Sequence, residues 1–218
     1  MLAKKEVLER IRLIGLVPVL RAESEDQAMC LASAIIAGGM TVMEVTMTVP
    51  GAVRVIAKLI KEYPDVLVGA GTVLDPETAQ TCIVEGAQFI VSPAFNVRTV
   101  EMCQRYSIAA LPGALTPTEV VTAWQCGADV IKVFPANSMG GAKYLRSLKA
   151  PLPQVELIPT GGVSLATAHE FLEAGAFALG VGSDLVDTRA MAEGHPEKIT
   201  ETAQRYLQIV KKFQQRSN

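Results

Sequence analysis

The sequence Ala128-Asp-Val-Ile-Lys-Val-Phe-Pro135 places a lysine, Lys132, in the middle of an apolar run. A short run that is apolar on both of its alternating faces is typical of a strand buried on both sides, as in a parallel sheet covered by helices. The other nine lysines of the chain lie in segments with helical patterning or at the ends of such segments. This stretch therefore predicts a parallel α/β fold with one lysine in a buried strand.

A lysine in a buried strand is costly unless it has a chemical or structural partner. Burial disfavours the charged ammonium form, so a neutral amine becomes available as a nucleophile toward a carbonyl, which is the first step of Schiff-base chemistry. The alternative is a side chain that extends to the strand end and pairs there with a carboxylate. Burial alone leaves both interpretations of Lys132 open, and its position as the one lysine in a predicted strand favours the chemical role.

Outward from this strand, short β-branched runs alternate eight times with longer amphipathic stretches, which predicts parallel strands joined by helical crossovers. The strands are expected near 16–20, 41–46, 65–69, 88–91, 108–111, 129–133, 154–158 and 177–181. The helices are expected near 24–37, 50–62, 76–85, 97–106, 117–125, 140–148, 165–173 and 197–213, with an extra one near 3–13. We therefore predict a (β/α)8 TIM barrel with an extra N-terminal helix, as one domain over residues 1–218.

Local signals support several of these boundaries. Ser24, Asp75 and Thr116 stand at helix starts, the last with a glutamate three residues on. Glycines expected in the left-handed position after alternate helices recur at Gly38, Gly86, Gly127 and Gly175. The rival fold is an open doubly wound sheet, which is disfavoured because the chain has neither a G-x-G-x-x-G turn nor a visible break in strand order.

The composition excludes several classes of partner. With 218 residues, a net charge of −2 and 5% aromatic residues, the chain offers neither a basic surface for nucleic acid nor stacking platforms for its bases. Charges, glycines or prolines interrupt every apolar run before membrane-spanning length. The cysteines are scattered without a C-x-x-C pair and no leader opens the chain, so we expect reduced thiols in a cytoplasmic protein.

Strand alternation groups the candidate catalytic residues. Glu44 shares a face with Thr46 in the second strand, and Lys132 shares a face with Phe134 in the sixth. If both faces point into the barrel, Glu44 and Lys132 meet, and a carboxylate beside an imine-forming lysine is suited to the proton transfers of imine and enamine chemistry. A structural Glu–Lys ion pair is the alternative.

Glycine-rich loops follow three strands. Ile158-Pro-Thr-Gly-Gly-Val163 and Leu179-Gly-Val-Gly-Ser183 come after the seventh and eighth strands, where this fold commonly binds phosphate through backbone N–H groups and helix starts. In Val68-Gly-Ala-Gly-Thr-Val73, Thr72 is placed to hold a carboxylate. Each loop alone also fits a plain turn. The first two together favour a phosphorylated ligand.

Other polar residues limit the kinds of reaction that the site can catalyse. Arg21 follows the first strand and is placed to hold a carboxylate or phosphate, or else to lie on the surface. His169 and His195 are the only histidines, and both fall in exposed helix or loop positions, so no metal site is expected. Without metal ligands, activation of a carbonyl falls to Lys132 as a covalent amine.

Several motifs, in this order along the chain, resemble the class I KDPG/KHG aldolase family. They are Glu-Val-Thr at 44–46, Gly-Ala-Gly-Thr-Val at 69–73, Ser-Pro at 92–93, Leu-Pro-Gly at 111–113, Lys-Val-Phe-Pro at 132–135, Pro-Thr-Gly-Gly-Val at 159–163 and Gly-Ser at 182–183. The resemblance implies a homotrimeric barrel that reversibly cleaves 2-keto-3-deoxy-6-phosphogluconate to pyruvate and glyceraldehyde 3-phosphate, and also 4-hydroxy-2-oxoglutarate. It implies no cofactor.

The resemblance also implies roles for individual residues. Lys132 would form the imine with C2 of pyruvate, and Glu44 would be the acid/base. Thr72 and Pro93 would line the pyruvate end of the site, with Phe134 beside the lysine. The residues implied to hold the substrate hydroxyl and phosphate are Thr160, Gly161, Gly162, Gly182 and Ser183.

The chain departs from the family at one position. Many members carry an arginine two residues after Glu-Val-Thr to bind the substrate carboxylate, and Thr48 stands there in this sequence. We expect Arg21 to replace that arginine, because it ends the neighbouring strand and members with the Thr-Val-Pro variant tend to carry an arginine there.

Three alternatives stay open. The nearest is an aldolase for the C4 epimer, 2-keto-3-deoxy-6-phosphogalactonate, although Thr160 resembles the residue of the gluconate-type enzymes. A phosphosugar isomerase or epimerase on the same barrel would use Lys132 only electrostatically. A non-catalytic phosphosugar-binding barrel would keep the glycine loops but has no use for inward-facing Glu44 and Lys132.

Overall fold

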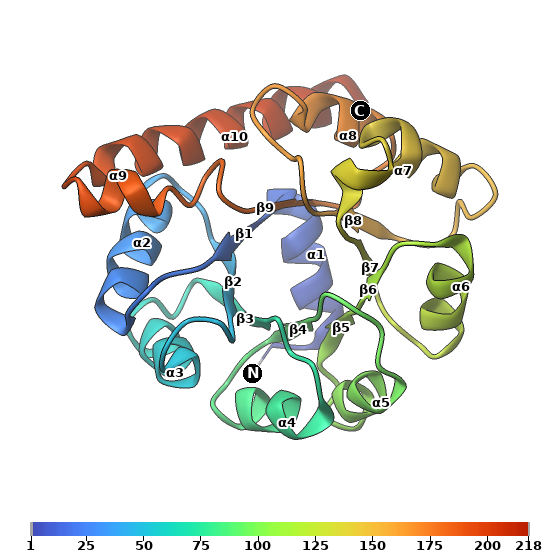
Figure 1. Ribbon diagram of the computed structural model, residues 1–218, viewed down its shortest axis with the longest axis horizontal. Coiled ribbons are helices and arrows are strands. Elements are labelled where there is room, and N and C mark those ends of the chain that lie inside the picture. Colours follow the sequence, from blue (N-terminus) through green and yellow to red (C-terminus); the bar gives the residue numbers. More distant parts are fainter. Residues whose placement is uncertain (1, 218) are drawn as a thin grey trace.

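The computed structural model describes residues 2–217 and contains a ring of parallel strands with helices around its outside (Figure 1). The strands are β1 (Leu16–Leu20), β2 (Val42–Thr46), β3 (Leu67–Gly71), β4 (Phe89–Val91), β5 (Ala109–Leu111), β6 (Gly113–Ala114), β7 (Ile131–Val133), β8 (Leu157–Pro159) and β9 (Leu179–Val181). They form two sheets, in the orders β5-β4-β3-β2-β1-β9 and β6-β7-β8. All the strand pairs of these sheets are parallel.

The two sheets join into a closed ring. β5 and β6 are separated only by Pro112, which has no N–H to continue the ladder, so the strand expected at 108–111 pairs with β4 through β5 and continues to β7 through β6. On the other side, a parallel bridge between Thr160 and Gly180 connects the end of β8 to β9. This ring in chain order confirms the predicted (β/α)8 barrel and excludes the open doubly wound sheet.

The helices match the predicted alternation, with two additions. They are α1 (Lys4–Ile14), α2 (Glu25–Ala37), α3 (Ala52–Glu62), α4 (Pro76–Val84), α5 (Val97–Arg105), α6 (Pro117–Gln125), α7 (Ala142–Lys149), α8 (Ala168–Glu173), α9 (Thr188–Ala192) and α10 (Pro196–Ser217). The sequence did not predict α9 or the 3₁₀ turn η1 (Ala136–Met139), because both are too short to show an apolar period. α7 begins two residues later than predicted, since Gly140 and Gly141 have φ of 105° and 63°.

The predicted helix caps are present, with one correction. Ser24 and Asp75 each accept a hydrogen bond from a backbone N–H of the first turn, and Thr116 forms a capping box with Glu119. Gly38 does not adopt the expected left-handed conformation, because its φ is −76°. The next residue, Gly39, takes it instead with φ 93°.

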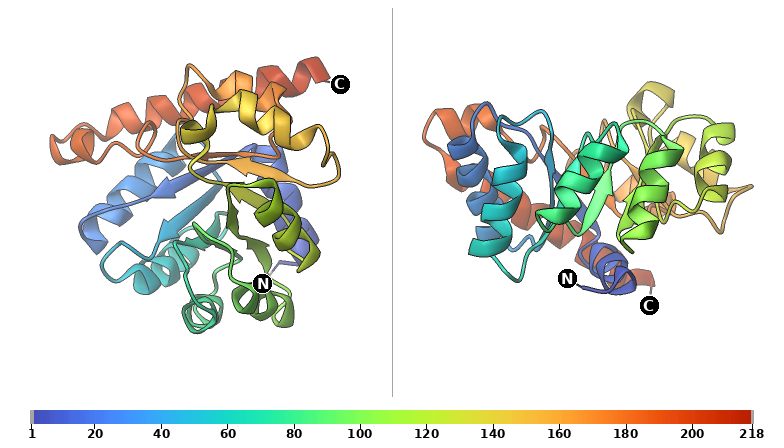
Figure 2. Two further views of the ribbon diagram at one scale, coloured as in Figure 1. Left: turned by 45° about the vertical axis from the view of Figure 1, so that its right-hand side comes forward. Right: turned by 90° about the horizontal axis from the view of Figure 1, so that it is seen from below.

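Two apolar clusters divide the interior. The larger one packs the outer faces of the strands against the surrounding helices. The smaller one fills the barrel, where Val17, Val42 and Leu67 meet Val7 and Ile11 of α1. Because these strand residues stand at the N-terminal ends, α1 covers that mouth of the barrel, as the views in Figures 1 and 2 show.

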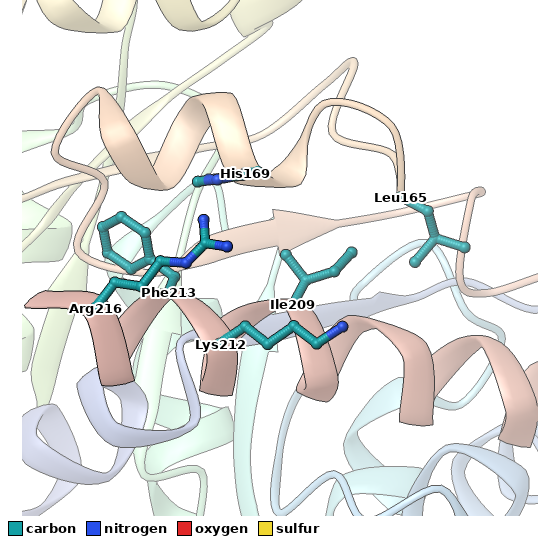
Figure 3. Close-up of a pocket in the computed structure, with 6 residues that line it drawn as sticks. All are labelled: Leu165, His169, Ile209, Lys212, Phe213 and Arg216. Atoms are coloured by element: carbon teal, nitrogen blue, oxygen red, sulfur yellow. The ribbon is translucent and has the colours of Figure 1, made fainter.

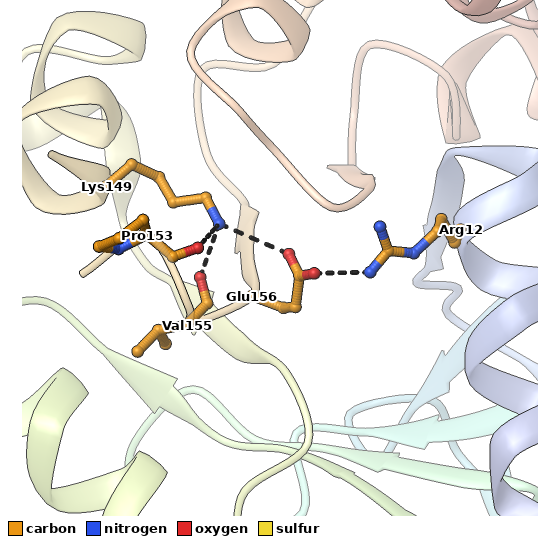
Figure 4. A network of polar contacts seen from close by, with 5 residues as sticks. All are labelled: Arg12, Lys149, Pro153, Val155 and Glu156. Carbon is orange, nitrogen blue, oxygen red and sulfur yellow. Dashed lines mark hydrogen bonds and ion pairs between the residues drawn. The ribbon is translucent and has the colours of Figure 1, made fainter.

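A polar network holds the end of α1 in place (Figure 4). Arg12 pairs with Glu156, which lies just before β8, and Lys149 pairs with the same carboxylate at 3.5 Å. The lysine also donates to the carbonyls of Pro153 and Val155, at 3.3 and 2.8 Å. With this mouth covered, a ligand reaches the barrel from the C-terminal ends of the strands. No helix in the described part of the chain is long and apolar enough to cross a membrane.

Candidate active site

Glu44 and Lys132 lie side by side inside the barrel. Glu44 comes from β2 and Lys132 from β7, two strands that are not neighbours in the ring, so their side chains meet across the interior. The distance between Lys132 Nζ and Glu44 Oε1 is 3.5 Å, and the side chains are only 6% and 3% exposed. The strand alternation in the sequence therefore predicted this encounter.

The space for the Glu44 carboxylate depends on a glycine. A Cβ at Gly71 on the neighbouring strand β3 would lie 2.4 Å from Glu44 Oε1. Among the described residues, no group forms a hydrogen bond with the buried Oε1 atom, although Lys132 Nζ lies near it. A buried oxygen of this kind requires an explanation. Proton exchange between this oxygen and a bound substrate would be such an explanation.

Phe134 lies beside Lys132, and Pro93 and Thr72 follow the ends of strands β4 and β3. Lys132 Nζ lies 5.5 Å from the centroid of the Phe134 ring. Gly113 is the register partner of Lys132, and a Cβ at Gly113 would lie 2.2 Å from the backbone of Pro93, so Pro93 packs against β6, the strand next to that of the lysine. Thr72 follows Gly71 and has φ 58°, which is an outlier for a β-branched residue and typical of functional positions.

A cavity of about 140 Å³ opens at the C-terminal ends of the strands. It brings together residues at or after the ends of four strands, β1, β7, β8 and β9. Its lining consists of Val19, Arg21, Phe134, Thr160, Gly161, Gly162, Val163, Gly182, Ser183 and Asp184. All five residues predicted to hold the substrate hydroxyl and phosphate therefore lie in one cavity, together with Arg21.

The backbone of this cavity is suited to an anion. Gly161 and Gly162 have φ of 94° and 76°, which only glycine adopts without strain. In the described chain, the N–H groups of Gly162 and Ser183 donate to no protein acceptor, so they are free to bind a ligand. The expected contribution of helix starts is absent, because α8 and α9 begin well after these loops and are short.

Arg21 is the free cation of the cavity. Its side chain is exposed, and within residues 2–217 it forms no ion pair. Thr48, in the position where many family members carry an arginine, is also exposed, and its hydroxyl lies 2.7 Å from that of Thr46. Thr46 in turn donates to the carbonyl of Leu20, the residue before Arg21.

Sequence reasoning missed Asp184, Gly71 and Gly113. Asp184 follows the Gly-Ser motif directly and resembles a surface residue in the sequence. The two glycines stand in or next to strands, where a glycine signals close approach of another group, and that signal was available in Val68-Gly-Ala-Gly71. Only the fold identifies the groups that approach them.

Other pockets and reactive side chains of the described residues are less suited to catalysis. A groove between α8 and α10 is lined by Leu165, His169, Ile209, Lys212, Phe213 and Arg216 and lies outside the barrel (Figure 3). Burial raises the pKa of Cys82 to about 11 and that of Cys103 to about 12, so neither is a thiolate at neutral pH. No cluster of potential metal ligands occurs among residues 2–217.

A buried lysine beside a glutamate inside an α/β barrel is the arrangement that a Schiff-base aldolase needs. The model of the family described as KDPG and KHG aldolase matches residues 7–202. The chain belongs to this family. It is 40% identical over 205 residues to a 2-dehydro-3-deoxy-phosphogluconate aldolase of Treponema pallidum. The alignment covers 94% of this chain and 96% of that protein.

Solved structures agree with this assignment. The chain superimposes with a TM-score of 0.84 on a KDPG aldolase from Legionella pneumophila, in which pyruvate was captured as a covalent carbinolamine; the identity is 31%, over 91% of this chain and 96% of that one. A structure described as native KDPGal gives a TM-score of 0.81 at 29% identity, over 92% of this chain and 96% of the other.

Proposed function

We propose that this protein is a class I aldolase that reversibly cleaves 2-keto-3-deoxy-6-phosphogluconate to pyruvate and glyceraldehyde 3-phosphate. The observation that carries the proposal is the buried pair of Lys132 and Glu44, 3.5 Å apart inside a barrel whose mouth holds a cavity lined by glycine loops. Family membership and the names of the relatives give the substrate class. The same family description supports 4-hydroxy-2-oxoglutarate as a second substrate.

In the proposed reaction, the amine lone pair of Lys132 adds to the C2 carbonyl, and the carbinolamine takes up a proton and loses water to give a protonated imine. Glu44, directly or through a water, accepts the proton of the C4 hydroxyl, and the C3–C4 bond breaks. Its electrons enter the imine to form an enamine, and glyceraldehyde 3-phosphate leaves. The carboxyl group then returns the proton to C3, and hydrolysis releases pyruvate. The imine serves as the electron sink, so the route needs no metal or cofactor.

The surrounding residues take binding roles in this proposal. Thr72 and Pro93 line the pyruvate end, and Phe134 packs beside the amine. Thr160, Gly161, Gly162, Gly182 and Ser183 bind the substrate hydroxyl and phosphate, which is supported by their common cavity and by the free N–H groups there.

Arg21 binds the substrate carboxylate in this proposal, in place of the arginine absent at Thr48. Its place at the end of the first strand, without an ion-pair partner among residues 2–217, leaves it available to an anionic group of the substrate. Arg21→Ala is expected to raise the KM for the phosphorylated keto acid about tenfold or more, since a charge-assisted contact is lost. Unchanged KM and kcat in this variant would show that another group binds the carboxylate.

The second candidate substrate is the C4 epimer, 2-keto-3-deoxy-6-phosphogalactonate. The likeness to the native KDPGal structure favours it, and the barrel, lysine and glutamate would serve both epimers. A coupled assay with lactate dehydrogenase, run on each epimer separately, measures pyruvate release. A higher kcat/KM for the gluconate series supports the proposal, and a higher value for the galactonate series replaces it with the second candidate. No pyruvate from either would instead favour an isomerase or epimerase.

We also infer a single domain, a homotrimer and a cytoplasmic location. Closure of one barrel by strands from both ends of the chain supports the single domain. The trimer follows from the family resemblance, and exposed Leu74 and Val97 offer apolar surface for a subunit contact. The four free cysteines are consistent with a reducing compartment. Light scattering after gel filtration measures the subunit number.

A further inference from the structure

Asp184 connects the two loops of the anion-binding cavity. It follows Ser183 in the loop after β9 and lines the cavity. Its Oδ2 atom accepts a hydrogen bond of 3.2 Å from the backbone N–H of Leu165, which belongs to the loop after β8. The same oxygen accepts a hydrogen bond from the hydroxyl of Tyr206 on α10.

Tyr206 is a rigid anchor for this contact. Its side chain is fully buried and is among the largest fully buried side chains of the described chain. Burial, followed by the hydrogen bond to Asp184, raises the pKa of the Tyr206 phenol, so the hydroxyl keeps its proton and donates. α10 itself lies along the outside of the barrel, where it contacts α2, α8 and α9 (Figure 1).

A carboxylate beside an anion-binding loop needs a reason, because it repels the ligand. The hydrogen bonds of Asp184 supply such a reason, because they fix the positions of the loops. Through a single oxygen, the loop that carries Gly161 and Gly162 and the loop that carries Gly182 and Ser183 are tied to each other and to α10. The two loops therefore have two links, the Thr160–Gly180 bridge at the strand ends and the Asp184 carboxylate beyond it, which Tyr206 holds.

We propose that Asp184 and Tyr206 are positioning residues that hold the two phosphate-binding loops at the spacing required by the substrate phosphate. This inference rests on the proposed aldolase function and deepens it. Neither residue touches the reacting carbon atoms in this account. Their loss is therefore expected to weaken the binding of phosphorylated substrate while the chemistry at Lys132 and Glu44 continues.

The test compares a substrate that carries phosphate with one that does not. In Tyr206→Phe, which removes only the hydroxyl, the KM for the phosphorylated keto acid is expected to rise about five- to tenfold, the effect of one lost hydrogen bond, with kcat changed less than about twofold. Exchange of the methyl protons of pyruvate in D2O, followed by NMR, uses Lys132 and Glu44 without any phosphate. Its rate and half-saturating pyruvate concentration are expected to match the wild type.

Tyr144→Phe is the matched control, because Tyr144 also donates its hydroxyl, to the carbonyl of Leu115, but lies outside the cavity. It is expected to leave the KM for the phosphorylated substrate unchanged. In Asp184→Asn, an acceptor oxygen remains, and the rise in KM is expected to be smaller than in Asp184→Ala.

Several results would overturn the inference. One is an unchanged KM for the phosphorylated substrate in Tyr206→Phe, and another is an equal loss in pyruvate exchange. If Tyr206→Phe does not fold, the exposed Asp184 carries the test, and an unchanged KM in Asp184→Ala contradicts the proposal. A wild type that exchanges no pyruvate protons would contradict the aldolase function instead, so the two failures are distinguishable.

Discussion

The position of the Glu44 carboxylate depends on the absence of a side chain at residue 71. A Cβ there would lie 2.4 Å from Oε1 and 2.8 Å from Cδ of the glutamate. Since real Cβ atoms do not approach so closely, the carboxylate of a Gly71→Ala variant must move away from its place beside Lys132. In the proposed reaction, Glu44 would then no longer be aligned with the substrate hydroxyl.

We therefore expect Gly71→Ala to lower kcat by about tenfold to a hundredfold, the usual effect of moving a catalytic group by an ångström or less. Lys132 itself is untouched by the change, so pyruvate should still be trapped on it by borohydride. Steady-state kinetics and trapping on the same preparation measure the two effects. A kcat like that of the wild type would mean that the position of Glu44 is not critical.

At the scale of single residues, the sequence predicted the pairing of Glu44 and Lys132 because strand alternation fixes which side chains share a face. It did not predict the roles of Gly71 and Asp184. A glycine at a close approach and an acid that ties two loops both act on groups remote in the sequence. Such partners are known only when the chain is folded.

Side-chain caps stabilise the N-termini of several helices. Asp75 caps α4 by accepting hydrogen bonds from the backbone N–H and the hydroxyl of Thr78, at 2.7 and 3.0 Å. These bonds, with the backbone contribution the larger, hold the pKa of Asp75 below its usual value. Because the pKa is depressed in the folded state, the stabilisation is present above the unfolded pKa and is lost as the pH falls through the folded one.

Asp75→Ala is expected to reduce the free energy of unfolding by about 1 kcal/mol at neutral pH. The difference from the wild type should be smaller at an acid pH below about 3.9, the pKa of an aspartate in the unfolded chain, because the stabilisation is lost as the pH falls further. Urea unfolding at both pH values measures it. Ser24→Ala is the control, since the hydroxyl cap of α2 does not titrate and its cost should not vary with pH. A cost of Asp75→Ala that is the same at both pH values would contradict the assignment.

At the scale of elements, the sequence predicted the eight main strands and helices because their periods are long enough to recognise. It failed where an element is a single turn, as in η1 and α9, and at Gly38, where the chain takes its left-handed turn one residue later. The β-ladder is interrupted at Pro112 because proline has no N–H, and hydrophobic periodicity in the sequence does not reveal such an interruption.

Helix α1 closes the N-terminal end of the barrel, and the stability of the whole molecule depends on this packing. Ile11 is fully buried against the strand residues of the interior cluster, whereas Leu13 of the same helix is 73% exposed. Ile11→Ala is expected to lower the free energy of unfolding by about 2 to 5 kcal/mol, because it leaves a cavity under the barrel. Leu13→Ala, a matched loss of apolar atoms at the surface, should cost less than about 0.5 kcal/mol.

Denaturant titration of both variants measures the difference. Equal costs for the two substitutions would mean that α1 does not pack into the barrel in solution. The prediction of an extra helix before the first strand came from the sequence, but its use as a floor did not. That use depends on which apolar ends of the strands remain uncovered once the ring has closed.

The proposed reaction depends on a covalent imine at Lys132, and borohydride reduction in the presence of pyruvate traps such an imine. Intact mass followed by peptide mapping should find one reduced pyruvyl adduct on the peptide that carries Lys132, and none in Lys132→Ala. The other nine lysines serve as internal controls in the same digest. No adduct at saturating pyruvate, or an adduct on a different lysine, would contradict the account.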